Sequence, residues 1–288
     1  MTEGSNMTNF ELTKQICEEI RTEYRVPCLP FALEKGETGI TDSKADGVPY
    51  LPKDQPWPRD AKGTPLLFLA QINCTQLVPL PDFPHTGLLQ FFVGADDLWG
   101  MDFDNMTNTG GFRVLYWETV DPSVTEADVA AKRPPVPQEY GSPVFQPCRI
   151  LFGAPVQQGM TPGDFHFDIL FVQKWNQKKP DQPIEKSWDI FELLDEEDDA
   201  DALFAYHDED DEDNPFHQLG GFPYFTQNDP REEDYSEMDV LLFQLDSDSS
   251  DRKDLVLWGD CGVGNFFISR EALKRRDFSR VLYNWDCC

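Results

Sequence analysis

The sequence predicts an α+β protein whose two similar halves are built from mostly antiparallel strands, with a few peripheral helices. Three observations predict this fold class: short apolar segments of strand length, a capped amphipathic helix near the start of the chain, and a set of motifs that occurs twice in the same order. With 288 residues, 40% of them hydrophobic, the chain is long enough to bury one large core. We therefore expect a single domain over 1–288.

The repeated motifs predict an internal duplication. The separations between matching residues are 174 for Pro49 and Pro223, 173 for Gln71 and Gln244, 175 for Phe91 and Phe266, and 167 for Arg113 and Arg280. The matches keep one order at nearly one separation, so they define two halves at about 36–118 and 213–288. Two copies indicate a pseudo-symmetric domain, because a solenoid needs three or more units.

The first element is a helix. Thr8 and Glu11 have the spacing of a capping box, and apolar residues then follow every four positions. Pro27 and Pro30 are expected to stop this helix. The apolar positions are Leu12, Ile16, Ile20 and Tyr24.

Further segments predict strands and two more helices. Apolar or alternating runs predict strands at 66–72, 88–93, 112–117, 150–152, 165–172, 240–245, 255–258, 265–268 and 280–283. Apolar spacings of four, three and three predict a helix over 184–198, and Ser269 is expected to cap a short helix over 270–276. The proline-rich stretch 121–147 is expected to be a connector between the halves.

Charge and cysteine content exclude several kinds of partner. The net charge of −29 disfavours nucleic acid and anionic membranes, which are both polyanions. No apolar run approaches 18 residues, and the first residues lack the basic and apolar parts of a signal peptide. The seven cysteines are scattered without metal or redox spacing, so we expect reduced thiols and a cytoplasmic location.

Much of the negative charge lies in one region. Residues 189–239 hold 20 acidic residues against the single base Arg231. The densest part, 195–213, is expected to be an acidic loop. It is either a solvated loop, the usual state of such runs, or a docking surface for a basic partner.

The sequence offers no catalytic residue and no cofactor site. None of the four histidines stands in a pattern with serine or cysteine, and Cys261 follows a carboxylate, which raises the pKa of a thiol. The glycines at 262 and 264 precede a strand instead of a helix, so they do not form a nucleotide fingerprint.

Carboxylates near the C-terminal repeat are the candidate metal ligands. Asp246 and Asp248 begin a segment like a calcium loop, but Asp251 replaces the glycine that such loops need; a solvated turn is the alternative. Asp260 either accepts N–H bonds from Gly262 and Gly264 within its turn or joins Asp246 and Asp248 in a shared site.

Several motifs together resemble the YwqG-like family of uncharacterised, mostly bacterial proteins. The resemblance implies an α+β fold with two intertwined repeats, but no established activity and no catalytic residues. Some relatives lie near toxin and immunity loci, which implies a protective, partner-binding role. The motifs are Tyr50-Leu51-Pro52, Trp57-Pro58, Pro65 to Asn73, Gly87 to Phe92, Gly220 to Pro223 with Gln227, Leu242 to Asp246, and Trp258 to Gly262.

These observations predict a non-enzymatic recognition module that binds a protein partner. If the acidic run is the docking surface, the partner is basic. The resemblance implies that the module acts like an immunity protein. The alternative is a carboxylate-based, metal-dependent ligand binder or enzyme. The candidate binding residues are Trp57, Trp99, Gln71, Gln244, Trp258 and Asp260, and the candidate metal ligands are Asp246, Asp248 and Asp260.

Overall fold

The computed structural model describes residues 7–135, 141–195, 204, 216–248 and 254–288. The helices are α1 (Asn9–Glu23), η1 (Cys74–Gln76), α2 (Glu126–Ala130), α3 (Phe165–Lys178), η2 (Ser187–Leu193), α5 (Arg231–Asp234) and α6 (Arg270–Lys274), where η marks a 3₁₀ helix. The strands are β1 (Arg25–Lys35), β2 (Lys44–Ala45), β3 (Leu67–Asn73), β4 (Leu88–Val93), β5 (Arg113–Trp117), β6 (Cys148–Phe152), β7 (Val156–Gly159), β8 (Gln218–Gly220), β9 (Val240–Asp246), β10 (Val263–Ile268) and β11 (Leu282–Asp286).

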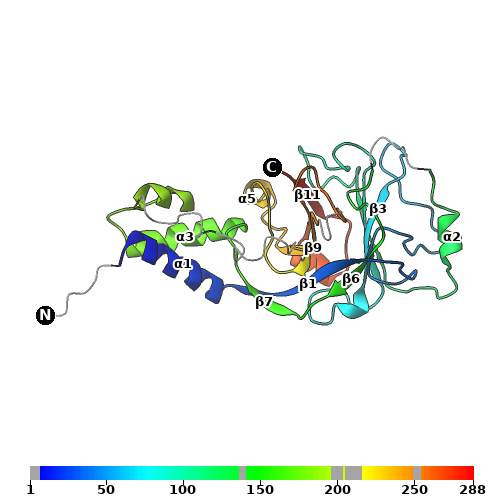
Figure 1. Cartoon of the computed structure of the whole chain (residues 1–288), viewed down its shortest axis with the longest axis horizontal. Coiled ribbons are helices and arrows are strands. Elements are labelled where there is room, and N and C mark those ends of the chain that lie inside the picture. Colours follow the sequence, from blue (N-terminus) through cyan, green and yellow to red (C-terminus); the bar gives the residue numbers. More distant parts are fainter. Residues whose placement is uncertain (1–6, 136–140, 196–203, 205–215, 249–253) are drawn as a thin grey trace.

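The strands form one antiparallel sheet that curls into a half-barrel, with few helices around it (Figure 1). Within the described ranges the sheet has 11 strands in the order β11-β10-β9-β8-β1-β6-β2-β3-β4-β5, and β7 pairs with β1 outside this path. The prediction of an α+β fold built from antiparallel strands is therefore confirmed.

The centre of the sheet is the pairing of β1 with β6. Phe31 lies opposite Phe152, and Leu33 lies opposite Ile150. From this centre, β8 continues from β1 and β2 continues from β6, and each leads to three antiparallel strands. The strands that follow β2 and β8 in the sheet each contain a bulge. In β3 the bulge is at Leu69, opposite β4, and in β9 it is at Leu242, opposite β10. Bulges increase local twist, which helps the sheet curl.

The concave side of the curled sheet holds the main core. Phe91 of β4 stacks on Phe243 of β9 at 4.5 Å between ring centroids and meets Phe266 of β10 at 4.9 Å. Neighbouring side chains on a strand point to opposite faces, so Phe92 and Phe267 leave this core and enter two smaller clusters on the other face. Rings from both arms of the sheet thus close one shared core.

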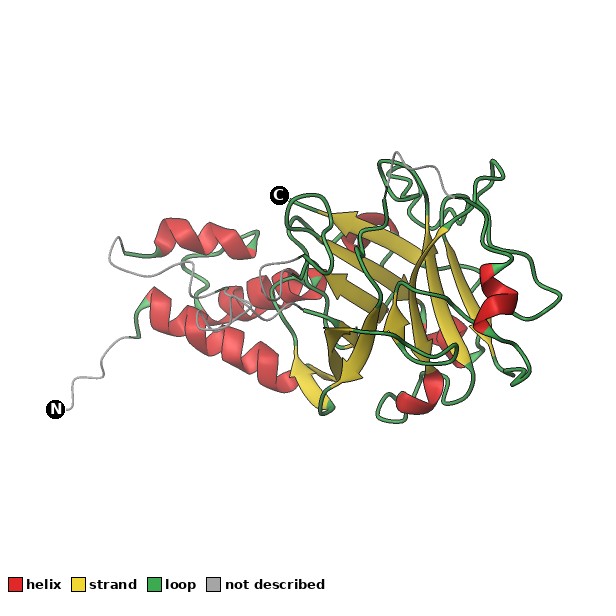
Figure 2. Ribbon diagram, turned by 45° about the vertical axis from the view of Figure 1, so that its right-hand side comes forward, coloured by secondary structure: helices red, strands yellow, loops and turns green. Residues whose placement is uncertain are grey.

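A pair of antiparallel helices, α1 and α3, projects from one end of the sheet (Figures 1 and 2). Ile16 and Ile20 of α1 pack in one cluster with Phe171 and Trp175 of α3. The capping box of Thr8 is formed as predicted, and α1 spans nearly the expected residues. None of the helices within the described ranges has the length and apolar character to cross a membrane.

The strand predicted over 165–172 is wrong, because these residues begin helix α3. The buried residues Phe167, Phe171 and Trp175 repeat every four positions, and Asp164 caps the helix by accepting the N–H of His166. Over eight residues, alternating apolar positions fit both a strand and one side of a helix. Packing against α1 decided between the two periods.

Other boundaries also differ from the prediction. The expected helix over 184–198 is only the 3₁₀ helix η2 within the described residues, and 255–258 contributes isolated bridges at Val256 instead of a strand. The connector over 121–147 contains the short helix α2. The predicted strands at 66–72, 88–93, 112–117, 240–245 and 265–268 are confirmed as β3, β4, β5, β9 and β10. Apart from Asp195 and Phe204, the acidic run 195–213 lies outside the described residues.

Candidate functional site

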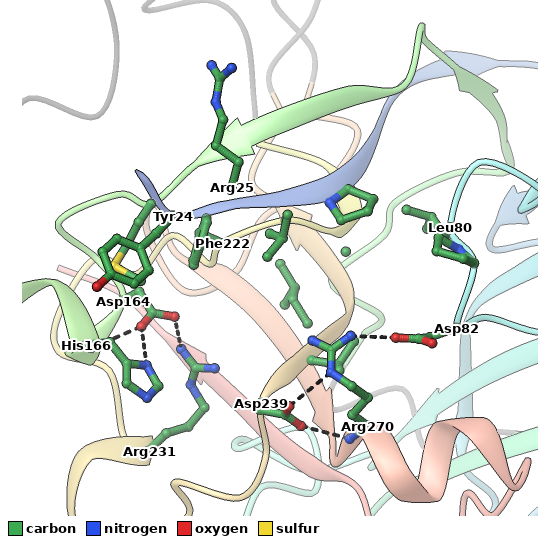
Figure 3. Close-up of a pocket in the computed structure, with 18 of the residues that line it drawn as sticks. Tyr24, Arg25, Leu80, Asp82, Asp164, His166, Phe222, Arg231, Asp239 and Arg270 are labelled. Carbon is green, nitrogen blue, oxygen red and sulfur yellow. Dashed lines mark hydrogen bonds and ion pairs between the residues drawn. The ribbon is translucent and has the colours of Figure 1, made fainter. Parts of the chain in front are cut away.

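A cavity of about 590 Å³ opens where the helix pair meets the sheet (Figure 3). This volume is in the usual range for a ligand pocket. Its walls come from segments that are distant in sequence: the start of β1, the turn after η1, the start of α3, the turn after β8 and the start of β9. The contributing ranges are 23–27, 80–83, 160–170, 220–222 and 239–241, together with Arg231 and Arg270.

The cavity wall is largely apolar and joins two cores. Leu80 and Phe83 belong to the main core under the sheet, whereas Met160 and Phe222 belong to the cluster between the helices. At the mouth, Ile169 of α3 is 55% exposed.

A buried ion pair closes one end of the cavity. Arg231 is 2% exposed; its Nη2 lies 2.8 Å from Asp164 Oδ2 and 2.6 Å from Asp229 Oδ2. His166 Nδ1 lies 2.8 Å from the other oxygen of Asp164. Burial raises the pKa of the Asp164 carboxyl, but the hydrogen bond with His166 and the charge of Arg231 outweigh it, so this pKa is lowered.

A more exposed group of charges forms the other end. The Arg270 guanidinium binds Asp82 and lies 3.4 Å from Asp239, and the backbone N–H of Arg270 donates to Asp239 at 2.8 Å. Arg276 donates to the carbonyls of Asp82 and Phe83 and thereby anchors their turn. Figure 3 shows Asp164, His166 and Arg231 on one side of the cavity and Asp82, Asp239 and Arg270 on the other.

The polar groups of the cavity are arranged in two sets of ion pairs. The charged groups at the two ends of the cavity, Asp164, Arg231, Asp82, Asp239 and Arg270, are engaged in ion pairs. No cluster of three or more histidine, cysteine or acidic side chains able to hold a metal ion occurs in the described ranges. What remains available is a preformed apolar space with charged ends.

The two glutamines proposed as binding residues are fully buried away from the cavity. Gln71 Oε1 accepts the N–H of Tyr50 at 2.9 Å, and Gln244 Oε1 accepts the N–H of Tyr224 at 2.9 Å. Neighbouring amides complete each network: Gln90 donates to the carbonyl of Tyr50 at 2.6 Å, and Asn265 donates to that of Tyr224 at 2.8 Å. In the structure both glutamines attach loops to the sheet.

The three tryptophans lie in two separate places, and none of them lines the cavity. Trp57 is buried and donates to the carbonyl of Leu66 at 2.8 Å, beside a smaller hollow of about 290 Å³. Trp99 meets the fully buried Trp258 edge-on at 5.2 Å and donates to the carbonyl of Gly141. The indole N–H of Trp258 has no hydrogen-bond partner in the described part of the chain.

The three candidate metal ligands are engaged with protein groups. Asp246 Oδ2 accepts the N–H of Phe216 at 3.0 Å, and His217 Nε2 lies 3.5 Å from Asp248 Oδ2. Burial raises the pKa of Asp246. Asp260 is exposed and accepts the N–H of Cys261 at 3.0 Å, whereas Gly262 donates to the carbonyl of Trp258. The expected bond from Gly262 to Asp260 is therefore wrong.

Sequence reasoning missed the residues around the cavity. Asp164, Asp239, Arg270 and Ile169 stand in no motif, and only the fold brings their segments together. One signal was present: Arg231 is the single base in the acidic region 189–239. A lone cation among many acids suggests a buried ion pair, because a charge is seldom buried without a partner.

The family of this chain is established by its sequence. The family described as Domain of unknown function (DUF1963) matches residues 43–287, so the chain belongs to that family. A comparison with curated proteins gives no significant match. The family description adds no activity, so the function has to be inferred from the site itself.

Replacing Arg231 by methionine should lower the free energy of unfolding by about 3–5 kcal/mol, because two buried carboxylates lose their cation. Because the folded pKa of Asp164 is lowered, its contribution in the parent is complete above the ordinary aspartate pKa of about 3.9 and is lost as the pH falls through the folded value. The variant should show a weaker pH dependence, because the hydrogen bond with His166 remains but the charge of Arg231 is lost. The measurement is urea unfolding between pH 2.5 and 7, with the half-exposed Arg270→Met as control at about 1 kcal/mol or less. Equal losses of unfolding free energy in the Arg231 and Arg270 variants would contradict a stabilising role for the buried ion pair.

Replacing Asp260 by asparagine should change the free energy of unfolding by about 0.5 kcal/mol or less, because the side chain is exposed and asparagine keeps an acceptor oxygen. The measurement is thermal unfolding with and without calcium or magnesium. A cation-induced rise in the melting temperature of the parent that is absent from the variant would instead favour the metal-dependent alternative.

Proposed function

We propose that this chain is a non-enzymatic recognition module that binds a protein partner, with the cavity between the helix pair and the sheet as its recognition site. The observation that carries this proposal is the apolar cavity itself, with ion pairs at both ends. Apolar space with few polar groups favours binding, and the exposed Ile169 extends it to the surface.

A basic partner suits the charge of the chain. A net charge of −29 attracts cations over long range and repels nucleic acid and anionic membranes. The resemblance to YwqG-like proteins supports the same class of function, namely an immunity-like protein that neutralises a partner by covering it. Binding of this kind needs no catalytic residue.

The metal-dependent alternative has less support. Asp246 accepts two backbone N–H groups, from Phe216 and Ser247, and Asp248 faces His217. Asp260 is engaged with its own turn. All three carboxylates therefore already serve contacts within the protein.

We also propose that the module arose by duplication and is made of two intertwined, pseudo-symmetric repeats. Support comes from contacts that recur at separations of 173 or 174 residues. Lys44 lies opposite Gln71 and donates to the carbonyl of Val48, while Gln218 lies opposite Gln244 and donates to the carbonyl of Phe222. The left-handed pair Asp46 and Gly47 likewise matches Gly220 and Gly221.

The exposed Ile169 provides the test of the recognition site. Ile169→Asp should abolish capture of the partner, because it places a carboxylate at the apolar mouth of the cavity. The control is Leu151→Asp on β6, which alters a leucine of similar exposure (47%) outside the cavity. The measurement compares proteins captured from a lysate of the source cell by the parent and both variants, at low and high salt. If the parent, the Ile169→Asp variant and the Leu151→Asp variant retain the same proteins equally, the proposal is overturned.

Lys44→Gln tests the equivalence of Lys44 and Gln218. Burial lowers the pKa of Lys44 to about 8, so the folded state favours the neutral amine. The parent should therefore gain stability as the pH rises from 8 toward the ordinary lysine value of about 10.4. The glutamine variant should lack this gain yet fold at pH 7, because glutamine can donate to Val48 as Gln218 does to Phe222. Lys44→Leu, which cannot donate, is the control. A glutamine variant no more stable than the leucine variant would argue against the equivalence.

A further inference from the structure

Strand β8 is shorter than the two strands that flank it. It spans three residues and pairs with Cys28 to Pro30 of β1. However, β1 begins at Arg25, three residues before its first paired residue Cys28. In β9, Gln244 lies opposite Gln218, and the strand begins four residues before it, at Val240. Both neighbours are antiparallel to β8, so they are parallel to each other and extend past the same end of it.

The cavity occupies the place where β8 would continue. The chain leaves this position at Gly220 and Gly221, which have φ values of 65° and 74°. These values belong to the left-handed region that favours glycine. Paired strands lie about 4.8 Å apart, so β1 and β9 beyond β8 are separated by the width of one absent strand. The residues at these strand starts, 25–27 and 239–241, line the cavity.

The edge of β1 at this gap has free backbone groups. The carbonyl of Tyr24 accepts from Met160 on the β7 side, whereas that of Pro27 accepts from Gly221 on the β8 side. Alternation along the strand therefore directs the N–H and C=O of Arg25 toward the gap. Neither group has a hydrogen-bond partner in the described part of the chain.

The edge of β9 also directs backbone N–H and C=O groups into the gap. The backbone N–H of Ser247 donates to the carbonyl of Gly262. Between Ser247 and the bulge at Leu242, the backbone N–H and C=O of the odd-numbered residues are therefore directed toward β10. The bulge at Leu242 reverses this alternation, and Val240 then faces Ile268 of β10. The backbone of Leu241 is consequently directed into the gap.

The two faces of the gap are apolar. Leu80 and Phe83 line it from the main core, and Met160 and Phe222 line it from the helix cluster. A strand placed there would bury side chains on both of its faces. This is the environment of a central strand, not of an edge strand.

We propose that the cavity binds an extended peptide segment of a partner protein, which continues the line of β8 and pairs with both Arg25 and Leu241. Such β-strand addition uses backbone hydrogen bonds for affinity and alternate side-chain pockets for specificity. The segment carries apolar residues at successive positions in the gap and basic residues beside it, matching the net charge of −29. This inference rests on the proposed recognition function and names its ligand class.

The test uses capped hexapeptides with four apolar central residues and a lysine at each end. The tightest binder in such a library is compared with versions that carry a single N-methyl group at each central amide. N-methylation removes one N–H but keeps the side chains. Pairing with two edges predicts a loss of affinity of tenfold or more at consecutive central amides, because successive residues of a central strand bond to opposite neighbours, whereas pairing with one edge would give losses at alternate amides only. It also predicts slowed hydrogen exchange of the Arg25 and Leu241 amides.

A matched pair of variants separates backbone from side chain. Arg25→Pro removes the N–H that faces the gap, whereas Arg25→Ala keeps it and removes only the exposed side chain. Proline is compatible with this position because Tyr24 before it is extended, with φ −111° and ψ 99°, and β1 already contains Pro27 and Pro30. Arg25→Pro should weaken peptide binding at least tenfold more than Arg25→Ala, with circular dichroism checking that both fold.

The outcomes distinguish this inference from the function on which it rests. Peptide binding that is insensitive to N-methylation and to Arg25→Pro would overturn strand addition, while leaving recognition at the cavity intact. Absence of binding by every library peptide would also overturn it. If the Ile169→Asp variant loses its protein partner in that case, recognition at the cavity stands, with a folded surface of the partner as the ligand.

Discussion

The antiparallel pairing of β1 with β6 is the interaction on which the rest of the structure depends. It joins an early strand of the chain to one from its middle, and each arm of the sheet grows outward from it. Because strands twist in one direction, a sheet this wide curls. Curling brings Phe91 of one arm against Phe243 and Phe266 of the other, so a single core forms between arms that are distant in sequence.

Buried polar side chains then hold the loops on this sheet. A buried amide is costly unless it is hydrogen-bonded, so the networks of Gln71 and Gln244 define the position of the segments that contain Tyr50 and Tyr224. Repeated polar residues in apolar strands look like a binding site in sequence. Here they serve the backbone, and the recurring motifs reflect the needs of folding.

The cavity exists because several elements stop short of one another. The chain turns away at Gly220 and Gly221, and the ion pair of Arg231 with Asp164 holds the start of α3 against the sheet. Ion pairs lie at both ends of this space, one buried and one partly exposed, with an apolar wall between them. A preformed space of this kind lowers the ordering cost of the binding that we propose.

The sequence by itself determined the α+β class, the capped helix α1 and the main strands of both arms, because these depend on local patterns of apolar and capping residues. It also indicated the matched positions of Gln71 and Gln244. Tertiary packing decided that 165–172 is helical, since an eight-residue alternation fits two periods and only contact with α1 distinguishes them. The cavity was likewise decided by tertiary structure alone. Its walls combine five separate segments, and no local pattern records which strand ends will lie one strand apart.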